Sequence, residues 1–255
     1  MRTLITFSCE GETLAGTLDE APGTTGLLIV SGGNEIRSGA HRGMVMLAHR
    51  LAATGTPVFR YDRRGVGDST GSNGGFLSAE LDLIAAVAAF RNAAPHVTRL
   101  IGFGNCDAAS TLAMFGRSAG LHRIILANPW VVEPVDDLPP AAAIRVHYRS
   151  ALRDPVTWHR AMTGKISFTG FFKGLLKTAR TSSEGRTPLA RRVLAAIAAW
   201  DTDAKVVLAS GDATAIAFRN AAMATVPVET IDTDSHSFVG TAGVALENAI
   251  RRNLA

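Results

Sequence analysis

The sequence Gly104-Asn105-Cys106-Asp107-Ala108 follows an apolar run that includes Leu100 and Ile101, and it leads directly into a helical pattern. A strand, a tight turn and a helix in this order predict a nucleophile elbow, with Cys106 at the edge of a sheet. Positions 104 and 108 must be small, because a bulky Cβ there would collide with the neighbouring strand or helix. The N–H groups and the dipole at the start of a helix lower the pKa of a thiol, and they favour the reactive thiolate.

A second segment, Gly116-Arg117-Ser118-Ala119-Gly120, matches the literal Gly-x-Ser-x-Gly pattern. It follows a helical stretch and precedes the apolar run Ile124-Ile125-Leu126. We interpret it as the glycine-capped end of a helix that leads into a strand. Because a nucleophile elbow requires the opposite order, Ser118 is not the predicted nucleophile.

Short apolar segments alternate with helical patterns along the chain, which predicts an α/β fold with a mostly parallel, eight-stranded sheet and helices on both faces. The expected strands are Thr3–Cys9, Thr13–Leu18, Leu27–Val30, Val58–Tyr61, Arg99–Phe103, Arg123–Ala127, Lys205–Ala209 and Val228–Ile231. Helices are expected near Arg42–Thr54, Ser78–Asn92, Ala215–Ala224 and from Thr241, besides the one after the elbow. The C-terminal ends of parallel strands meet at one edge, where ligands bind in open α/β sheets.

Length and composition favour one soluble domain over residues 1–255, because 255 residues with 47% hydrophobic content can bury a large core. Two cysteines, Cys9 and Cys106, are too few for a disulfide framework and fit a reducing compartment. We expect Cys9, in the first strand, to be a small buried hydrophobe. We find neither a signal-peptide core nor a segment long enough to span a bilayer, so we expect a cytoplasmic protein.

Three residues that follow expected strands form a catalytic set: Cys106, Asp212 and His236. A cysteine nucleophile needs a base, and the base needs a carboxylate that fixes its tautomer. We therefore predict that His236 is the base and Asp212 the orienting acid. Two alternatives remain open: Asp212 as the N-cap of the following helix, and His236 as an ordinary surface-loop histidine.

Acyl chemistry also needs N–H donors for the developing oxyanion. We predict the backbone N–H of Asp107 and one from the turn after the third strand, at Gly33 or Asn34. Further along this turn, Arg37 and His41 either bind an anionic group of the substrate or are surface residues. The turn lacks a Gly-x-Gly-x-x-Gly or Walker pattern, and we predict neither a cofactor nor a metal site.

The chain resembles the α/β-hydrolases over nearly its whole length. This resemblance is carried by the elbow and by Leu28–Gly33, Arg60–Ser69, Ser210–Asp212 and Asp234–His236. More narrowly, Gly32–Asn34, Arg37, Gly39–Arg42 and Asn105–Ser110 resemble the exosortase A system-associated hydrolases of type 1, bacterial proteins tied to exopolysaccharide and protein-sorting loci. The resemblance implies an α/β-hydrolase fold and a Cys-His-Asp hydrolase. Cys106 departs from the usual serine, and Ala108 from the second glycine.

The segment 139–186 has a helical pattern, is rich in aromatic residues, and lies where α/β-hydrolases carry a lid. Basic residues concentrate in and around it, between Arg145 and Arg192, in a chain of formal net charge +4. They lack the aromatic interleaving that stacks bases, so we predict no nucleic-acid partner. A basic lid leaves two interpretations open: peripheral contact with an anionic inner membrane or an acidic partner, or an ordinary solvated face.

A thiolate nucleophile forms a thioester intermediate that water or another acceptor can attack. The sequence therefore predicts a hydrolase or acyltransferase that cleaves an ester or thioester bond of a small-molecule or acyl substrate. The competing hypothesis is a catalytically inactive module that binds a partner or lipid through its pocket and basic lid.

Overall fold

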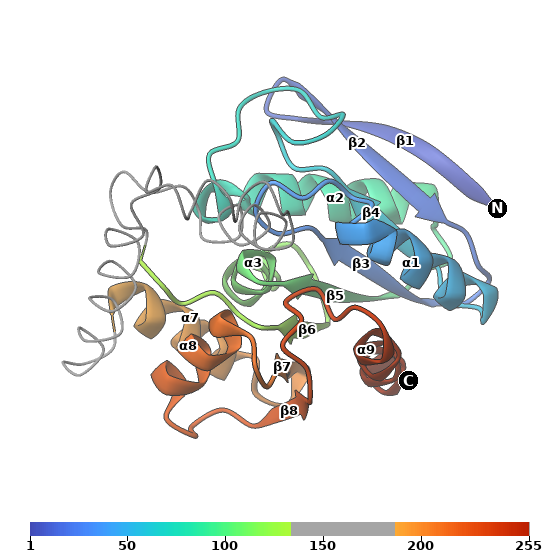
Figure 1. Cartoon of the computed structure of the whole chain (residues 1–255). Coiled ribbons are helices and arrows are strands. Elements are labelled where there is room, and N and C mark those ends of the chain that lie inside the picture. The colour runs from blue at the N-terminus through green and yellow to red at the C-terminus, as the bar shows by residue number, and fades with distance from the viewer. Residues whose placement is uncertain (134–186, 255) are drawn as a thin grey trace, which may run out of the picture. The chain divides into compact units, whose positions relative to one another are not determined.

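The computed structural model describes residues 1–133 and 187–254, and the predicted lid at 139–186 lies outside these residues. Residues Met1–Val132 and Leu189–Ala255 form one compact unit, which carries the whole sheet. Figure 1 shows the strands of this sheet between its covering helices.

The sheet has eight strands, as predicted. They are β1 (Arg2–Cys9), β2 (Glu12–Asp19), β3 (Thr25–Val30), β4 (Val58–Tyr61), β5 (Arg99–Asn105), β6 (Arg123–Ala127), β7 (Ala204–Ala209) and β8 (Val228–Ile231). Their spatial order is β1-β2-β4-β3-β5-β6-β7-β8. β2 pairs antiparallel with β1 and β4, whereas every pairing from β4 to β8 is parallel.

Helices cover both faces of the sheet, which explains why most residues of the central strands β3, β4, β5, β6 and β7 are buried, whereas β1 and β8 at the two edges keep exposed residues. The helices are α1 (Gly43–Ala53), α2 (Glu80–Ala93), α3 (Asp107–Phe115), α7 (Pro188–Ala199), α8 (Ala213–Ala222) and α9 (Thr241–Leu254). Alternate residues of one strand enter different cores: Leu28 and Val30 of β3 join the core with α2, α3, α7 and α8, while Leu27 and Ile29 join the core with α1 and α9. No helix in the described part of the chain is long and apolar enough to cross a membrane.

The strand-turn-helix at Cys106 has the predicted order, because β5 ends at Asn105 and α3 begins at Asp107. Cys106 between them has φ 64° and ψ −126°, a conformation that costs energy for a residue with a side chain. A Cβ on Gly104 would lie 2.8 Å from the Ala108 carbonyl carbon. The turn therefore admits only glycine at position 104 without a shift of the backbone.

Several element boundaries differ from the sequence prediction by one or two residues, and two of them lie next to the proposed site residues. β5 continues past Phe103 to Asn105, because Gly104 and Asn105 pair with Leu126 and Ala127 of β6. Helix α8 begins at Ala213, two residues earlier than expected, because a side chain caps its first turn.

Ser118 lies where the order of elements predicts, in the turn between the end of α3 and the start of β6. Its hydroxyl oxygen lies 2.9 Å from the Phe115 carbonyl oxygen and 2.8 Å from the Glu80 carboxylate, and its single proton can be donated to either acceptor. The contact with Phe115 closes the end of helix α3.

We expect Gly104→Ala to destabilise the protein by about 2 kcal/mol, as overpacking against backbone atoms does. The matched control is Gly43→Ala, because Gly43 has φ −58° and a Cβ there meets no atom within 4 Å. Urea unfolding followed by circular dichroism measures both changes. Equal stability of the two variants would contradict the packing argument.

Candidate active site

The backbone around Cys106 is held by β6 and by the loop that follows β6. The Cys106 N–H donates to the Ala127 carbonyl oxygen at 2.9 Å. The Cys106 carbonyl oxygen accepts from the N–H groups of Ala109 at 3.1 Å and Trp130 at 3.2 Å. These contacts hold the strained turn and keep the thiol at the N-terminus of α3, where the helix dipole favours an anion.

Asp212 and His236 lie together, as the sequence predicts, with 3.1 Å between His236 Nδ1 and Asp212 Oδ1. Because an ionised carboxylate only accepts hydrogen bonds, Nδ1 must carry the proton in this contact, which leaves Nε2 of the neutral ring as the basic nitrogen. Asp212 is buried, and His236 is partly exposed. This is the arrangement that a base and its orienting acid require.

Asp212 is the N-cap of α8, which confirms the N-cap interpretation of this residue, while its role as the orienting acid stays a prediction. Its Oδ2 accepts from the N–H groups of Thr214 at 2.9 Å and Ala215 at 3.1 Å. The two carboxylate oxygens thus have different partners, since Oδ1 meets the histidine and Oδ2 begins the helix. The cap therefore fixes the orientation of the carboxylate.

The turn after β3, residues 31–39, is called the β3 loop below. A Cβ on Gly32 would lie 2.7 Å from the Asn105 carbonyl oxygen and 2.7 Å from Asp107 Oδ1, so the loop passes close to the elbow. The Gly33 N–H donates to Asp107 Oδ1 at 2.7 Å. A role for Gly33 in binding an oxyanion would therefore require the Asp107 side chain to release this amide.

The other two predicted oxyanion donors are in a different situation. The Asn34 N–H has no hydrogen-bond partner among residues 1–133 and 187–254. The Asp107 N–H is the first of α3 and therefore has no acceptor within its helix. This pair of amides fits the predicted donor role better than a pair that includes Gly33.

Three polar residues at the end of β4 hold the β3 loop in place. Arg60 Nη1 donates to the Arg37 carbonyl oxygen at 2.8 Å, and Arg63 Nη2 donates to the Gly33 carbonyl oxygen. The Asp62 carboxylate, which is fully buried, accepts from the Arg37 N–H at 2.5 Å. The sequence analysis did not identify Arg60 and Arg63 as site residues. They could have been noticed because a charged residue is unusual within, or directly after, a strand whose other residues are buried.

Arg37 and His41, the predicted substrate-binding residues, differ in how they are held. The Arg37 guanidinium pairs with Asp62 and Asp68, the latter at 2.8 Å, and its Nε donates to Thr17 at 3.1 Å. Contact with a substrate would require these interactions to open. His41 is exposed and has φ 52° in the short turn Ala40–Arg42.

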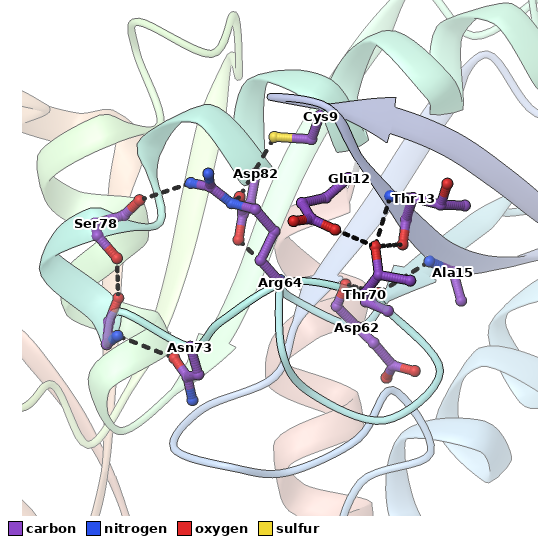
Figure 2. Close-up of polar contacts among 12 residues, drawn as sticks. Cys9, Glu12, Thr13, Ala15, Asp62, Arg64, Thr70, Asn73, Ser78 and Asp82 are labelled. Carbon is purple, nitrogen blue, oxygen red and sulfur yellow. Dashed lines mark hydrogen bonds and ion pairs between the residues drawn. The ribbon is translucent and has the colours of Figure 1, made fainter.

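The β4 loop, residues 62–79, is tied to the β1–β2 hairpin, as Figure 2 shows. The N–H of Thr13 donates to the Thr70 hydroxyl at 2.9 Å, and the N–H of Ala15 donates to the Ser69 hydroxyl at 2.9 Å. Arg64 pairs with the buried Asp82 of α2. These contacts make the β4 loop a firm support for the β3 loop.

Cys9 belongs to this supporting network (Figure 2), where its thiol donates to Asp82 Oδ1 at 3.4 Å. Burial raises the pKa of the Cys9 thiol to about 11, and the hydrogen bond to Asp82 acts in the same direction. A thiol with this pKa is almost wholly protonated at neutral pH and reacts slowly as a nucleophile. Cys9 is buried, as expected, but its thiol takes part in a polar contact and is more than a small hydrophobe.

Two further carboxyl groups lie near His236. Burial raises the pKa of Asp107, against the opposing effects of Arg63 and the Gly33 N–H. Desolvation likewise raises the pKa of Glu35, an exposed residue of the β3 loop, against the opposing charge of His236. Both carboxyl groups are therefore protonated more readily in the folded protein than the same groups would be in water.

A small cavity of about 20 Å³ joins three parts of the site. It is lined by Gly32 and Glu35 of the β3 loop, Asn105 before the nucleophile, and Ser237 and Phe238 after the histidine. This volume exceeds the roughly 10–15 Å³ that one water molecule needs, although Val30, Phe103 and Leu246 make part of the wall apolar. In the described residues no group of three or more His, Cys, Asp or Glu side chains could hold a metal ion.

No protein-family model matches the chain, and no curated protein matches it in sequence. Solved structures do resemble it. An esterase from Pyrococcus furiosus is 15% identical with a TM-score of 0.65, and the match covers 100% of this chain and 90% of the esterase chain. The thioesterase domain of the curacin biosynthetic pathway is 13% identical with a TM-score of 0.60, covering 98% and 99%.

A third similar structure, from Xanthomonas campestris, is described as an α/β serine hydrolase without a lid. It is 14% identical with a TM-score of 0.60, and the match covers 99% of this chain and 93% of that chain. With the observed strand order and elbow, these similarities show that the chain has the α/β-hydrolase fold.

Substitution of Asp212 separates its two roles. Asp212→Asn keeps a good N-cap but offers His236 an amide in place of a carboxylate, so we expect near-native stability with impaired function. Asp212→Ala loses the cap as well and should cost about 1 kcal/mol more. Urea unfolding of both variants measures the difference. Equal stability of the Asn and Ala variants would contradict the capping role.

Asp107 makes stability depend on pH. Its raised pKa means that the folded state binds the proton more tightly than the unfolded state, so this group's contribution to stability falls as pH rises above its ordinary value. Asp107→Asn removes that loss and keeps an acceptor for Gly33. We expect the variant to gain in melting temperature over the wild type as pH is raised from about 4 to about 8. A difference in melting temperature between the variant and the wild type that does not change with pH would contradict this account.

Proposed function

We propose that the protein is a cysteine-dependent hydrolase or acyltransferase that cleaves an ester or thioester with Cys106, His236 and Asp212. The observation that carries the proposal is the contact between His236 Nδ1 and Asp212 Oδ1, made beside an elbow that presents a thiol. An acid-oriented imidazole next to a nucleophile elbow is the arrangement that acyl transfer requires. The similarity in fold to an esterase and a thioesterase supports this choice of reaction.

In the proposed acylation step, the Cys106 thiol gives its proton to His236 Nε2, and the resulting thiolate attacks the carbonyl carbon of the substrate and forms a C–S bond. The carbonyl oxygen becomes an oxyanion, which the N–H groups of Asp107 and Asn34 would stabilise. Collapse of this intermediate breaks the bond to the leaving alcohol or thiol, which takes the proton held on His236 Nε2. The product is an acyl-enzyme with a thioester at Cys106.

In the deacylation step, His236 Nε2 removes a proton from water or from an acceptor alcohol, thiol or amine. The activated oxygen, sulfur or nitrogen attacks the thioester carbonyl, the C–S bond breaks, and the thiolate is restored. Throughout the cycle Asp212 keeps the imidazole in one tautomer and stabilises its charged form.

Sulfur at the elbow favours activated acyl groups. A thiolate is present near neutral pH more readily than an alkoxide, and it is a weaker base and a better leaving group than the alkoxide of an ordinary ester. When Cys106 attacks a thioester, the attacking thiolate and the departing thiolate are leaving groups of similar quality. When it attacks an alkyl ester, the departing alkoxide is a poorer leaving group than the thiolate. We therefore propose thioesters and activated esters as the preferred substrates.

The setting we propose is bacterial and cytoplasmic. It follows from the resemblance of Gly32–Asn34 and Asn105–Ser110 to the exosortase A system-associated hydrolases, and it implies an acyl substrate linked to exopolysaccharide or protein sorting. A basic lid would allow peripheral contact with the inner membrane or an acidic partner.

A panel of acyl-thioesters and activated esters, each incubated with the protein and followed by intact mass, tests the proposal. We expect a mass increase of one acyl group at Cys106 and release of the leaving group. Cys106→Ala should abolish the adduct and lower turnover by roughly 10³-fold or more, as other losses of a triad residue do. Cys9→Ala is the matched control and should leave both unchanged, because that thiol is protonated and lies outside the site.

Unchanged turnover in Cys106→Ala would overturn the proposal. Absence of any adduct or product over the whole panel, with retained affinity for a lipid or protein partner, would favour the inactive binding module.

A further inference from the structure

We infer that Asn128 is a positioning residue that holds the three segments of the proposed triad in register. Asn128 directly follows β6, lies between β5 and β7, and is fully buried. The inference rests on the proposed roles of Cys106, His236 and Asp212, none of which Asn128 replaces.

The contacts of Asn128 reach each of the three segments. Its Oδ1 accepts from the Ala209 N–H at 2.8 Å, three residues before Asp212. Its Nδ2 donates to Asn105 Oδ1 at 3.2 Å, one residue before Cys106, and lies 3.4 Å from the carbonyl oxygen of His236. One side-chain amide therefore contacts the ends of two strands and the loop that carries the histidine.

The orientation of both amides follows from their partners. The Ala209 N–H can only donate, so the atom of Asn128 that faces it must be oxygen, and Nδ2 must face Asn105. Asn105 then presents its oxygen to Asn128 and its Nδ2 to the His236 carbonyl oxygen, at 3.0 Å. The His236 carbonyl is thus held by the residue that precedes the nucleophile.

The backbone of Asn128 is part of the same arrangement. It has φ 43°, a left-handed conformation that asparagine adopts more readily than most residues. Its N–H donates to the Val207 carbonyl oxygen at 3.0 Å, which continues the pairing of β6 with β7. A buried amide with all its polar atoms satisfied sets one geometry, because any displacement would leave an unpaired polar group.

The consequence is a fixed relation between thiol and imidazole. Residues 105 and 236 are far apart in sequence, yet one hydrogen bond joins them, and Asn128 fixes the amide that makes this bond. Misplacement of a catalytic group by about 1 Å can lower the rate of a reaction by about 10²-fold. Loss of the Asn128 amide should therefore affect chemistry more than substrate binding.

The test variant is Asn128→Gly, because glycine adopts a φ of 43° without strain and removes only the amide side chain. Asn105→Ala is a second variant, which removes the bond to the His236 carbonyl and leaves the backbone of residue 128 intact. The control is Ile124→Val, a buried substitution in β6 that costs stability but does not contact the site.

We expect Asn128→Gly and Asn105→Ala to lower kcat by about 10²-fold with little change in KM, while Ile124→Val retains the wild-type kcat. The pH profile of Cys106 alkylation should differ from that of the wild type in the two asparagine variants only. Wild-type kcat and an unchanged alkylation profile in both asparagine variants would overturn the inference, as would an equal loss in Ile124→Val.

A readout that does not depend on turnover separates this inference from the proposed function. The low-field proton resonance of His236 Nδ1, bonded to Asp212, should be present in the wild type and in Ile124→Val and be lost or broadened in Asn128→Gly. If wild-type protein shows no acyl chemistry, the proposed function fails, while this resonance still decides whether Asn128 positions His236. A resonance retained in Asn128→Gly and Asn105→Ala overturns the positioning role.

Discussion

The close approach of strand β5 to helix α3 at Gly104 is the constraint on which the site depends. The approach leaves no room for a Cβ, and it places Cys106 in a conformation that an isolated residue would avoid. Hydrogen bonds from Trp130 and to Ala127 hold this conformation. The energy needed to keep the thiol at the tip of the turn is therefore supplied by the packing of the sheet and not by the residue itself.

The fold could be predicted from the sequence because its signals are local. The strands from β3 to β7 are short, mostly apolar runs between helical patterns, so the order of these elements can be recognised along the chain. The order strand, turn, helix also separated Cys106 from Ser118, although Ser118 lies in the more familiar motif. The ends of β5 and α8 were less accurate, because pairing with β6 and a cap by Asp212 decide them.

The finer geometry could not be predicted, because it depends on which distant side chains meet. Asp107 lies beside the nucleophile in sequence, yet the partner of its carboxylate is the Gly33 amide on another loop. Arg37 looked available for a substrate, but Asp62 and Asp68 take its guanidinium. For Asn128, the sequence showed only that a polar residue follows an apolar strand, and this does not predict its contacts. The position of a residue relative to the strands indicates at which edge of the sheet it lies. It does not indicate which side chain or backbone group it will contact at that edge.

The two oxygens of Asp212 have a consequence for how this position can vary. Oδ1 meets His236 while Oδ2 closes the first turn of α8, and the short side chain allows both at once. Glutamate has the same charge, but its extra methylene would carry the carboxylate away from one of the two partners. Asparagine would serve the helix but not the imidazole. A residue that made only one of these two contacts could be replaced by glutamate or asparagine. Because Asp212 makes both, only aspartate at this position keeps the helix cap and the contact with the imidazole together.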